Sequence, residues 1–217
     1  MNAITIGMNP NIFHIGGLTI AWHGVFTAVA VLVGILIPAW LISSSKKESE
    51  RILKGNANAT LTHQTTRFMG LSVDEIFNIA LWGVPGGIVG ARLVHVIDYW
   101  AVYSANPAQI VMINEGGLAI WGAILGGVIV GAAYCWVRKL PVGGYLAVIA
   151  FGLILAQATG RIGDDINGAH IANASNLPWA FIYSHPNSPS FGLQPQHPAV
   201  LYELLMDLAI FGLLWAL

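Results

Sequence analysis

The residues of this chain best suited to chemistry form a polar cluster at positions 160–168, which read Gly-Arg-Ile-Gly-Asp-Asp-Ile-Asn-Gly. The cluster follows directly on an apolar stretch, residues 145–159, so a guanidinium, two carboxylates and a carboxamide meet water at the end of a predicted membrane helix. Ionisable groups at that depth are costly to keep unless they pair or bind something. An arginine in such a place is suited to bidentate binding of a phosphate. The cluster is therefore the first candidate for a functional site.

The composition places the chain among integral membrane proteins. Of its 217 residues, 56% are hydrophobic and only 9% are charged, whereas a soluble domain carries roughly 25% charged residues. A net charge of −1 gives no reason to expect nucleic-acid binding. The single Cys135 excludes an internal disulfide framework. The N-terminus shows no basic region or cleavage site of a removable signal peptide.

Five apolar segments are long enough, or nearly so, to cross ~30 Å of hydrocarbon as helices. They cover residues 18–42, 76–97, 118–137, 144–160 and 199–217. The pattern predicts an all-α, polytopic helical bundle, with residues 1–217 forming a single transmembrane domain. Ser72 and Glu75 have the spacing of a capping box at the start of the second helix. Because the last segment is still apolar at Leu217, we expect the chain to be a truncated version of something longer.

Basic residues predict how these helices are oriented. Seven of the nine Lys and Arg fall in the loop 44–75 and in the short loop at Arg138 and Lys139. The positive-inside rule then makes both loops cytoplasmic. The N-terminus and the loop 161–198 are expected to face outward.

With this orientation, polar side chains from several helices come together in the outer half of the membrane. They are His23, Arg92, His95, Glu115, Arg161, Asp164, Asp165, Asn167, His170, His197, Tyr202, Glu203 and Asp207. Transporters usually place such groups near the midplane instead. A site in the outer leaflet indicates a lipid headgroup as ligand. Gly116 and Gly117 would let the backbone approach that ligand closely.

Simpler explanations exist for several of these residues. Arg92 and Arg161 could pair with Glu203 or Asp207 only to hold the bundle together. His23 and His95 could be partly buried interfacial residues. Small-residue patterns at 83–87, 86–90, 122–126 and 127–131 predict close helix packing.

A metal site at Asp164, Asp165 and His170 is a further alternative. No two of the candidate ligands have a recognised helical metal spacing, so we predict no metal.

Five blocks of this sequence, in this order, resemble the prolipoprotein diacylglyceryl transferase family. The blocks are residues 21–24, 90–93, 115–122, 160–168 and 197–203. They read Ala-Trp-His-Gly, Gly-Ala-Arg-Leu, Glu-Gly-Gly-Leu-Ala-Ile-Trp-Gly, the polar cluster above, and His-Pro-Ala-Val-Leu-Tyr-Glu. The fourth block resembles the family signature, usually Gly-Arg-x-Gly-Asn-x-x-Asn-Gly-Glu. The resemblance runs from about Leu18 to the C-terminus.

This resemblance implies a reaction. In the family, a diacylglyceryl group moves from phosphatidylglycerol to the thiol of a lipobox cysteine in a preprolipoprotein, and glycerol phosphate leaves. The implied partners are phosphatidylglycerol, the preprolipoprotein signal peptide and the membrane, with other membrane subunits as a further expectation. No cofactor or metal is implied. The expected location is the bacterial cytoplasmic (inner) membrane, as a multi-pass protein.

The resemblance also implies roles for individual residues. Arg161 would bind the phosphate, the segment 164–167 would orient the headgroup, and Arg92 and Glu203 would support the pocket. The predicted substrate-binding residues are Arg92, Gly116, Gly117, Asn167, Tyr202 and Glu203. The predicted catalytic residues are Arg161, Asp164, His23 and His170.

The chain departs from the family pattern at several acid–base positions. The family often has Tyr at His23, His at Trp121, Asn at Asp164 and Glu at Ala169. The resemblance also implies a last helix with an arginine, which the 217 residues do not include. His23 or His170 would then take over as the base.

These departures leave an alternative function open. The chain would then be a catalytically impaired homologue that acts as a lipid-binding structural subunit of a larger membrane complex. A small-solute transporter is disfavoured, since no broken helix pair or inverted repeat appears.

Overall fold

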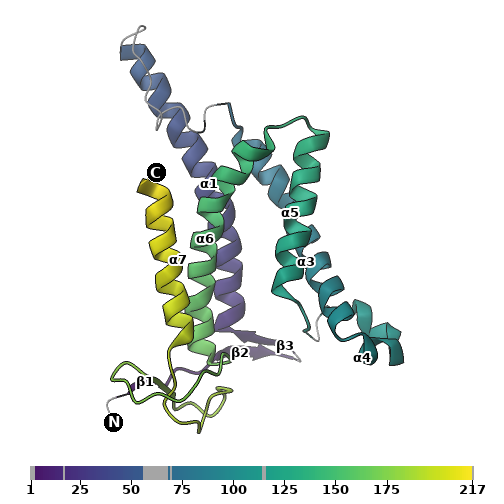
Figure 1. Ribbon diagram of the computed structural model, residues 1–217, viewed down its shortest axis with the longest axis vertical. Helices are drawn as coiled ribbons and strands as arrows, with labels where there is room; N and C mark the ends of the chain where they lie inside the picture. Colours follow the sequence, from purple (N-terminus) through teal and green to yellow (C-terminus); the bar gives the residue numbers. More distant parts are fainter. Residues whose placement is uncertain (1–2, 17, 56–67, 69, 114–115, 217) are drawn as a thin grey trace. The chain divides into compact units, whose positions relative to one another are not determined.

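The computed structural model describes residues 3–16, 18–55, 68, 70–113 and 116–216 (Figure 1). Within these ranges five helices are long and apolar enough to cross a membrane. They are α1 (Trp22–Gly55), α3 (Val73–Asp98), α5 (Ile120–Val137), α6 (Val142–Asn167) and α7 (Ala199–Ala216). The prediction of an all-α, polytopic membrane bundle is confirmed.

The remaining elements are short and lie between or before the long helices. A helix α4 (Trp100–Ala105) and a 3-10 helix η1 (Pro107–Val111) follow α3. The strands are β1 (Ile4–Ile6), β2 (Asn11–Ile15), β3 (Leu18–Ala21) and β4 (Phe181–Tyr183). β1 pairs in parallel with β4, so that Ile4 lies opposite Phe181. This pairing ties the N-terminus to the segment after α6.

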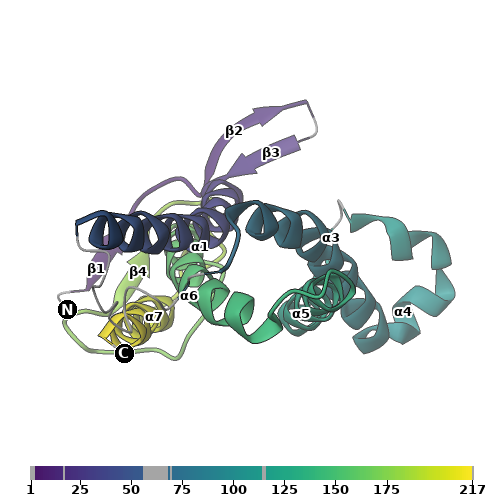
Figure 2. The same ribbon diagram turned by 90° about the horizontal axis from the view of Figure 1, so that it is seen from above.

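The hairpin of β2 and β3 corrects the predicted start of the first membrane helix. Residues 18–21 are apolar and were expected to be helical, but they pair antiparallel with β2. The helix begins only at Trp22, immediately after β3 (Figure 2). Thr19 and Ile20 are β-branched and pack well on a pleated surface. Apolarity alone does not separate such a strand from a helix.

Two helices continue beyond the apolar segments that predicted them. α1 runs to Gly55, so the first part of the predicted loop 44–75 is helical. α6 runs to Asn167, so Arg161 and Asp164 lie in a helix rather than in a loop. The Lys, Glu and Arg residues after Ser45 are good helix formers. Hydropathy marks where a helix leaves the lipid, not where its hydrogen bonds end.

The predicted capping box at the start of α3 is only partly present. Ser72 is the N-cap residue, but its side chain makes no capping hydrogen bond. Its backbone N–H donates instead to the Tyr145 hydroxyl, at 3.0 Å. Glu75 turns toward α5, where it accepts from the Tyr134 hydroxyl at 2.6 Å.

The described chain divides into two compact units, and α1 and α6 contribute to both. Unit 1 comprises Met1–Pro38 and Ile149–Leu217. Within it, α6 lies between α1 and α7 (Figure 1). A Cβ atom on Gly152 would lie 2.7 Å from the Pro38 ring, and one on Gly163 would lie 3.0 Å from the Cα atom of His23. Glycines on α6 therefore let α1 approach closely along this unit.

Unit 2 comprises Ala39–Val148 and is built on the packing of α3 against α5. The backbones are in contact at the glycine pairs 90/122 and 86/126. A Cβ atom added to Gly90, Gly122 or Gly126 would collide with the carbonyl oxygen of the opposite glycine, and one on Gly86 would collide with the Val130 side chain. The small-residue patterns predicted this contact, and the prediction is confirmed. Close backbone approach is a common basis of helix association in lipid.

The C-terminus of α5 is closed by a residue in the left-handed conformation. Lys139 has a φ of 57°. Its backbone N–H donates to the Trp136 carbonyl at 3.1 Å, and the Leu140 N–H donates to the Cys135 carbonyl at 2.8 Å. This is the Schellman arrangement, in which glycine is the preferred residue. A Cβ atom in this conformation costs about 1–2 kcal/mol.

We expect Lys139→Gly to raise the thermal stability of the detergent-solubilised protein. The net gain should be about 1 kcal/mol, since relief of strain exceeds the extra entropy of glycine in the unfolded chain. Lys139→Ala removes the same charge but keeps the Cβ atom, so it should give no such gain. An equal rise in both variants would mean that the charge, and not the backbone conformation, is unfavourable here.

Candidate functional site

The predicted catalytic residues of unit 1 form one connected cluster. His23 Nδ1 lies 2.6 Å from Asp164 Oδ1. Arg161 Nη1 donates to Asp164 Oδ2 at 3.0 Å, and its Nη2 lies 2.5 Å from Glu203 Oε2. His170 Nε2 lies 3.5 Å from Asp164 Oδ2. Asp164 therefore contacts all three of the other predicted catalytic side chains.

Local sequence explains how three helices and a loop supply this cluster. Arg161 and Asp164 are three residues apart on α6 and so share one face of the helix. Gly163, between them, has no side chain to hold α1 away, and His23 reaches across to Asp164. Glu203 comes from the first turns of α7, and His170 follows the end of α6. The spacing Arg-x-Gly-Asp thus serves both the ion pair and the helix contact.

Exposure within the cluster is uneven. The Asp164 side chain is 10% exposed and the Arg161 side chain 25%, whereas those of His23 and His170 are 52% and 50% exposed. The buried carboxylate orients groups that an incoming molecule can reach. If His23 Nδ1 carries the proton donated to Asp164, the lone pair of its Nε2 points away from the carboxylate. A carboxylate that fixes an imidazole in this way is a common arrangement for a general base.

Two residues that differ from the family pattern are in direct contact. The family often has Tyr at the position of His23 and Asn at that of Asp164. In the sequence these look like two unrelated departures from the family pattern. In the structure their side chains form the shortest hydrogen bond of the cluster involving a histidine. In this chain an imidazole and a carboxylate therefore meet at these two positions.

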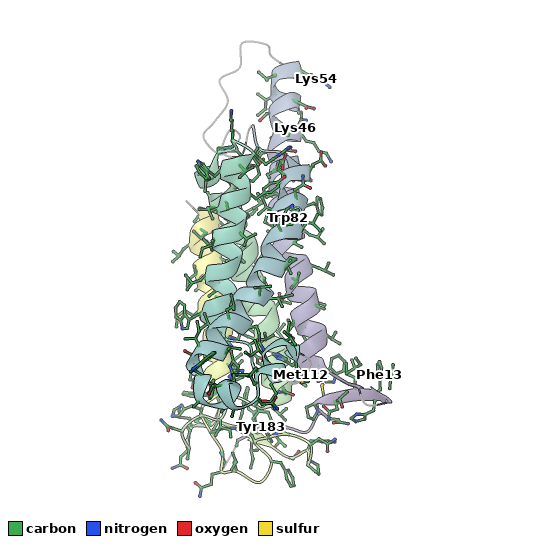
Figure 3. The ribbon with its side chains drawn as sticks, turned by 90° about the vertical axis from the view of Figure 1, so that its right-hand side faces the viewer. Phe13, Lys46, Lys54, Trp82, Met112 and Tyr183 are labelled. Carbon is green, nitrogen blue, oxygen red and sulfur yellow. The ribbon has the colours of Figure 1, made fainter. Side chains whose placement is uncertain are left out.

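A buried polar network holds the end of α6, and sequence reasoning missed it. The hydroxyls of Tyr183, Ser188 and Ser190 donate to the carbonyls of residues 165, 167 and 168, at 3.0, 3.3 and 2.7 Å. These carbonyls at the helix C-terminus lack partners within the helix. Burial and the nearby Asp165 raise the pKa of Tyr183 to about 12, so this phenol remains a donor at neutral pH. Tyr183 lies among the loop segments beyond α6 (Figure 3).

Gln196 extends the network into the loop that follows α6. Its Nε2 donates to Ser190 Oγ at 3.0 Å, and its Oε1 accepts from the Ala172 backbone N–H at 2.8 Å. Gln196 is 4% exposed and Ser190 1%. Gly168 has a φ of 67°, and a Cβ atom there would lie 2.7 Å from the Tyr183 ring. The Asn-Gly of the signature is thus the point where the loop packs onto the helix.

The other predicted binding residues of unit 1 lie near the same loop. The Tyr202 hydroxyl on α7 accepts from the Trp179 indole N–H at 2.8 Å. The backbone carbonyl of Asn167 is held by Ser188. Both residues are thereby positioned by the segment between α6 and α7.

Arg92, Gly116 and Gly117 lie in unit 2, where Arg92 contacts both glycines. Arg92 is 6% exposed, and its guanidinium donates to five backbone carbonyls. The acceptors belong to Gln109, Ile110, Met112, Gly116 and Gly117. Met112 is labelled in Figure 3.

The guanidinium of Arg92 also lies 5.1 Å from the centre of the Tyr103 ring. Gly117 has a φ of 79°, and a Cβ atom there would meet Arg92 Nη1 at 2.8 Å. Arg92 thus holds the segment before α5 in place. Glu115, also predicted near this site, lies outside the described residues.

Within the described ranges, no group of three or more His, Cys, Asp or Glu side chains is arranged to hold a metal ion.

The sequence matches a family profile over residues 10–217, that of prolipoprotein diacylglyceryl transferase. The chain therefore belongs to this family. Similar proteins named phosphatidylglycerol–prolipoprotein diacylglyceryl transferase occur in Nostoc sp. (30% identical, covering 94% of this chain and 65% of the relative) and in Clostridioides difficile (31%, 92% and 67%). Another occurs in Limosilactobacillus reuteri (32%, 99% and 70%). The chain spans about two thirds of the length of these relatives.

We expect Gln196→Leu to loosen the loop after α6 without unfolding the helices. The change leaves the Ala172 N–H and the Ser190 hydroxyl with fewer partners in a buried place, at about 1–3 kcal/mol for each group left unpaired. Hydrogen exchange of the Ala172 amide, read by mass spectrometry, should accelerate about tenfold or more.

Gln194→Leu is the matched control, because Gln194 is exposed two residues earlier in the same loop. It should leave exchange near Ala172 unchanged. Equal effects of the two variants would show that Gln196 does not hold the loop.

Proposed function

We propose that this chain transfers a diacylglyceryl group from phosphatidylglycerol to the lipobox cysteine thiol of preprolipoproteins. Its relatives carry this activity in their names. The observation that carries the proposal is the contact of Asp164 with both His23 and Arg161. One carboxylate connects a candidate base for the thiol with a cation for the phosphate.

The reaction replaces a carbon–oxygen bond by a carbon–sulfur bond and moves one proton from the thiol. The cysteine sulfur attacks the diacylglyceryl carbon, and a carbon–sulfur bond forms as the bond from that carbon to the phosphate oxygen breaks. The electron pair stays on the oxygen, and glycerol phosphate leaves. His23 Nε2 takes the thiol proton, because the thiolate is the nucleophile. Asp164 accepts the Nδ1–H and stabilises the imidazolium that results.

Arg161 stabilises the charge that develops on the departing phosphate. Its contacts with Asp164 and Glu203 use one N–H of each terminal nitrogen. A second N–H on each nitrogen remains for the phosphate oxygens. His170, half exposed and 3.5 Å from Asp164, can add positive charge when it is protonated. Cationic groups are needed because two carboxylates already flank the guanidinium.

The proposal includes a location in the bacterial cytoplasmic membrane. Five apolar helices and the family support a multi-pass membrane protein. Seven of the nine basic residues, within residues 44–75 and at 138–139, favour a cytoplasmic position for these two segments. The cluster at the start of α1 would then lie in the outer leaflet, with the preprolipoprotein signal peptide as its partner. A growth test in bacteria depends on this orientation, because the substrate cysteine must reach the cluster.

The test of the function is rescue of a bacterium depleted of its own transferase by the full protein. We expect growth and lipid-modified prolipoprotein to return. Stable, membrane-inserted protein without modified cysteine would contradict the proposal. That result would favour a lipid-binding subunit of a larger membrane complex.

We expect Arg161→Lys to be almost as inactive as Arg161→Ala. Each should lower the rate of transfer to a lipobox peptide by roughly 10²–10³-fold, because a point charge cannot reproduce the planar pair of donors. Arg138→Lys is the control, since Arg138 is exposed and pairs with Glu75, at 3.3 Å. If Lys at position 161 restores the wild-type rate, charge alone is sufficient and the bidentate phosphate contact is wrong.

We expect His23→Phe to lower the rate by roughly 10²-fold or more, the usual contribution of a general base. The protein should remain folded, because the His23 side chain is half exposed. His14→Phe, on the exposed β2 strand, should have no effect on transfer. Wild-type rates in the His23 variant would assign the base to another residue.

A further inference from the structure

Two polar pairs join α6 to α7, one helical turn apart. The outer pair is Arg161 with Glu203, whose Nη2 and Oε2 atoms are 2.5 Å apart. In the inner pair, Gln157 Nε2 donates to Asp207 Oδ1 at 3.3 Å. Gln157 and Arg161 are four residues apart on α6, and Glu203 and Asp207 are four apart on α7. Each helix therefore presents both of its members on one face.

One donor and one acceptor of these pairs are buried and unpaired. Among the side chains that the structure describes, only Arg161 Nε and Asp207 Oδ2 are buried nitrogen or oxygen atoms without a hydrogen-bond partner. Asp207 is 5% exposed. An unpaired buried polar group costs about 1–3 kcal/mol, and more when it is charged. The two orphan atoms belong to facing helices and to neighbouring turns.

The two atoms are chemically complementary. Arg161 Nε carries one hydrogen, which points along the same edge of the guanidinium as Nη2. Asp207 Oδ2 is a carboxylate oxygen whose orientation depends on χ2, a torsion with a broad energy profile. A small rotation of this carboxylate is therefore cheap, and a bond between the two atoms would satisfy both.

We propose that Asp207 is a positioning residue for Arg161, with its Oδ2 accepting the Nε–H of the guanidinium. Asp207 then binds Nε and Glu203 binds Nη2, so the two carboxylates together fix this edge of the Arg161 guanidinium. The edge formed by Nη1 and Nη2 is left facing the ligand, with Asp164 at its side. The proposal rests on the proposed function in that Arg161 binds the phosphate.

A purely structural role would not need a carboxylate at this place. A buried ionic group can often be replaced by an apolar residue of similar size without loss of stability. A carboxylate is useful if the direction of the guanidinium matters. A displacement of about 1 Å in a group that positions a substrate can cost 10²-fold in rate.

The experiment compares Asp207→Leu and Asp207→Asn in the full protein. Leu removes the acceptor, so kcat should fall about 10–100-fold while KM for the lipobox peptide stays unchanged. Thermal stability should be equal or higher. In Asp207→Asn, the amides of the new side chain and of Gln157 can both rotate, so that the amide oxygen at position 207 still accepts the Nε–H of Arg161. This variant should therefore retain most of the activity. Met206→Leu, at the lipid-exposed neighbouring position, is the control.

The pairing itself is tested by adding Asp207→Leu to Arg161→Lys. Lysine has no Nε–H edge, so the double variant should be no slower than Arg161→Lys alone. The proposal would be overturned if the fold reduction in kcat of the double variant equalled the product of the reductions in the two single variants. An Asp207→Leu protein with unchanged kcat would also overturn it.

A readout without activity separates this proposal from the proposed function. In ¹⁵N-arginine NMR spectra of the protein in lipid nanodiscs, the Arg161 Nε–H should exchange slowly with water in the wild type and rapidly in Asp207→Leu. If the wild type transfers no lipid, the proposed function fails while slow exchange still supports the pairing. Fast exchange in both proteins would overturn the pairing whatever the activity.

Discussion

The buried carboxylate of Asp164 is the group on which the candidate site depends. It contacts His23 on α1, Arg161 on its own helix and His170 in the following loop. A charged acceptor in a partly buried place makes stronger hydrogen bonds than a neutral amide. The same carboxylate also fixes the direction of two groups with different proposed roles, His23 as a base and Arg161 as a phosphate-binding cation. Because α1 can reach it only across Gly163, the close packing of α1 on α6 is a condition for the site.

The sequence predicted the membrane helices because a continuous run of about twenty apolar residues is the length that a helix needs to cross the hydrocarbon core. It predicted their ends less well. α6 continues through Asn167 because the backbone ladder does not stop where the side chains become polar. The hairpin before Trp22 was missed because hydropathy does not reveal that residues 11–15 pair with residues 18–21. The glycine patterns on α3 and α5 were informative because close contact between two helix backbones requires residues without a Cβ atom on both helices.

Individual site residues were predictable from their chemistry, but their partners were not. Arg161, Asp164 and His23 were chosen as ionisable groups near a membrane boundary, and the structure brings them into contact. Ser190 and Gln196 were not, since serine and glutamine in a loop look like solvated residues until burial is known. Arg92 was predicted to support a pocket, and its five bonds to backbone carbonyls show how one guanidinium can organise a loop. Tertiary pairing decides these cases, and single-sequence patterns do not contain it.

The unequal burial of the two carboxylates beside Arg161 determines which of them can yield to a ligand. Asp164 is 10% exposed and is also held by His23, whereas Glu203 is 50% exposed. An anionic phosphate near Arg161 meets repulsion from both. Moving Glu203 into water costs little, because an exposed ion pair is worth only about 0–1 kcal/mol. Moving Asp164 would break its part-buried contacts with His23 and Arg161. Glu203 can therefore adjust its position when a phosphate binds the remaining N–H groups of Arg161, while Asp164 keeps the guanidinium and the imidazole in place.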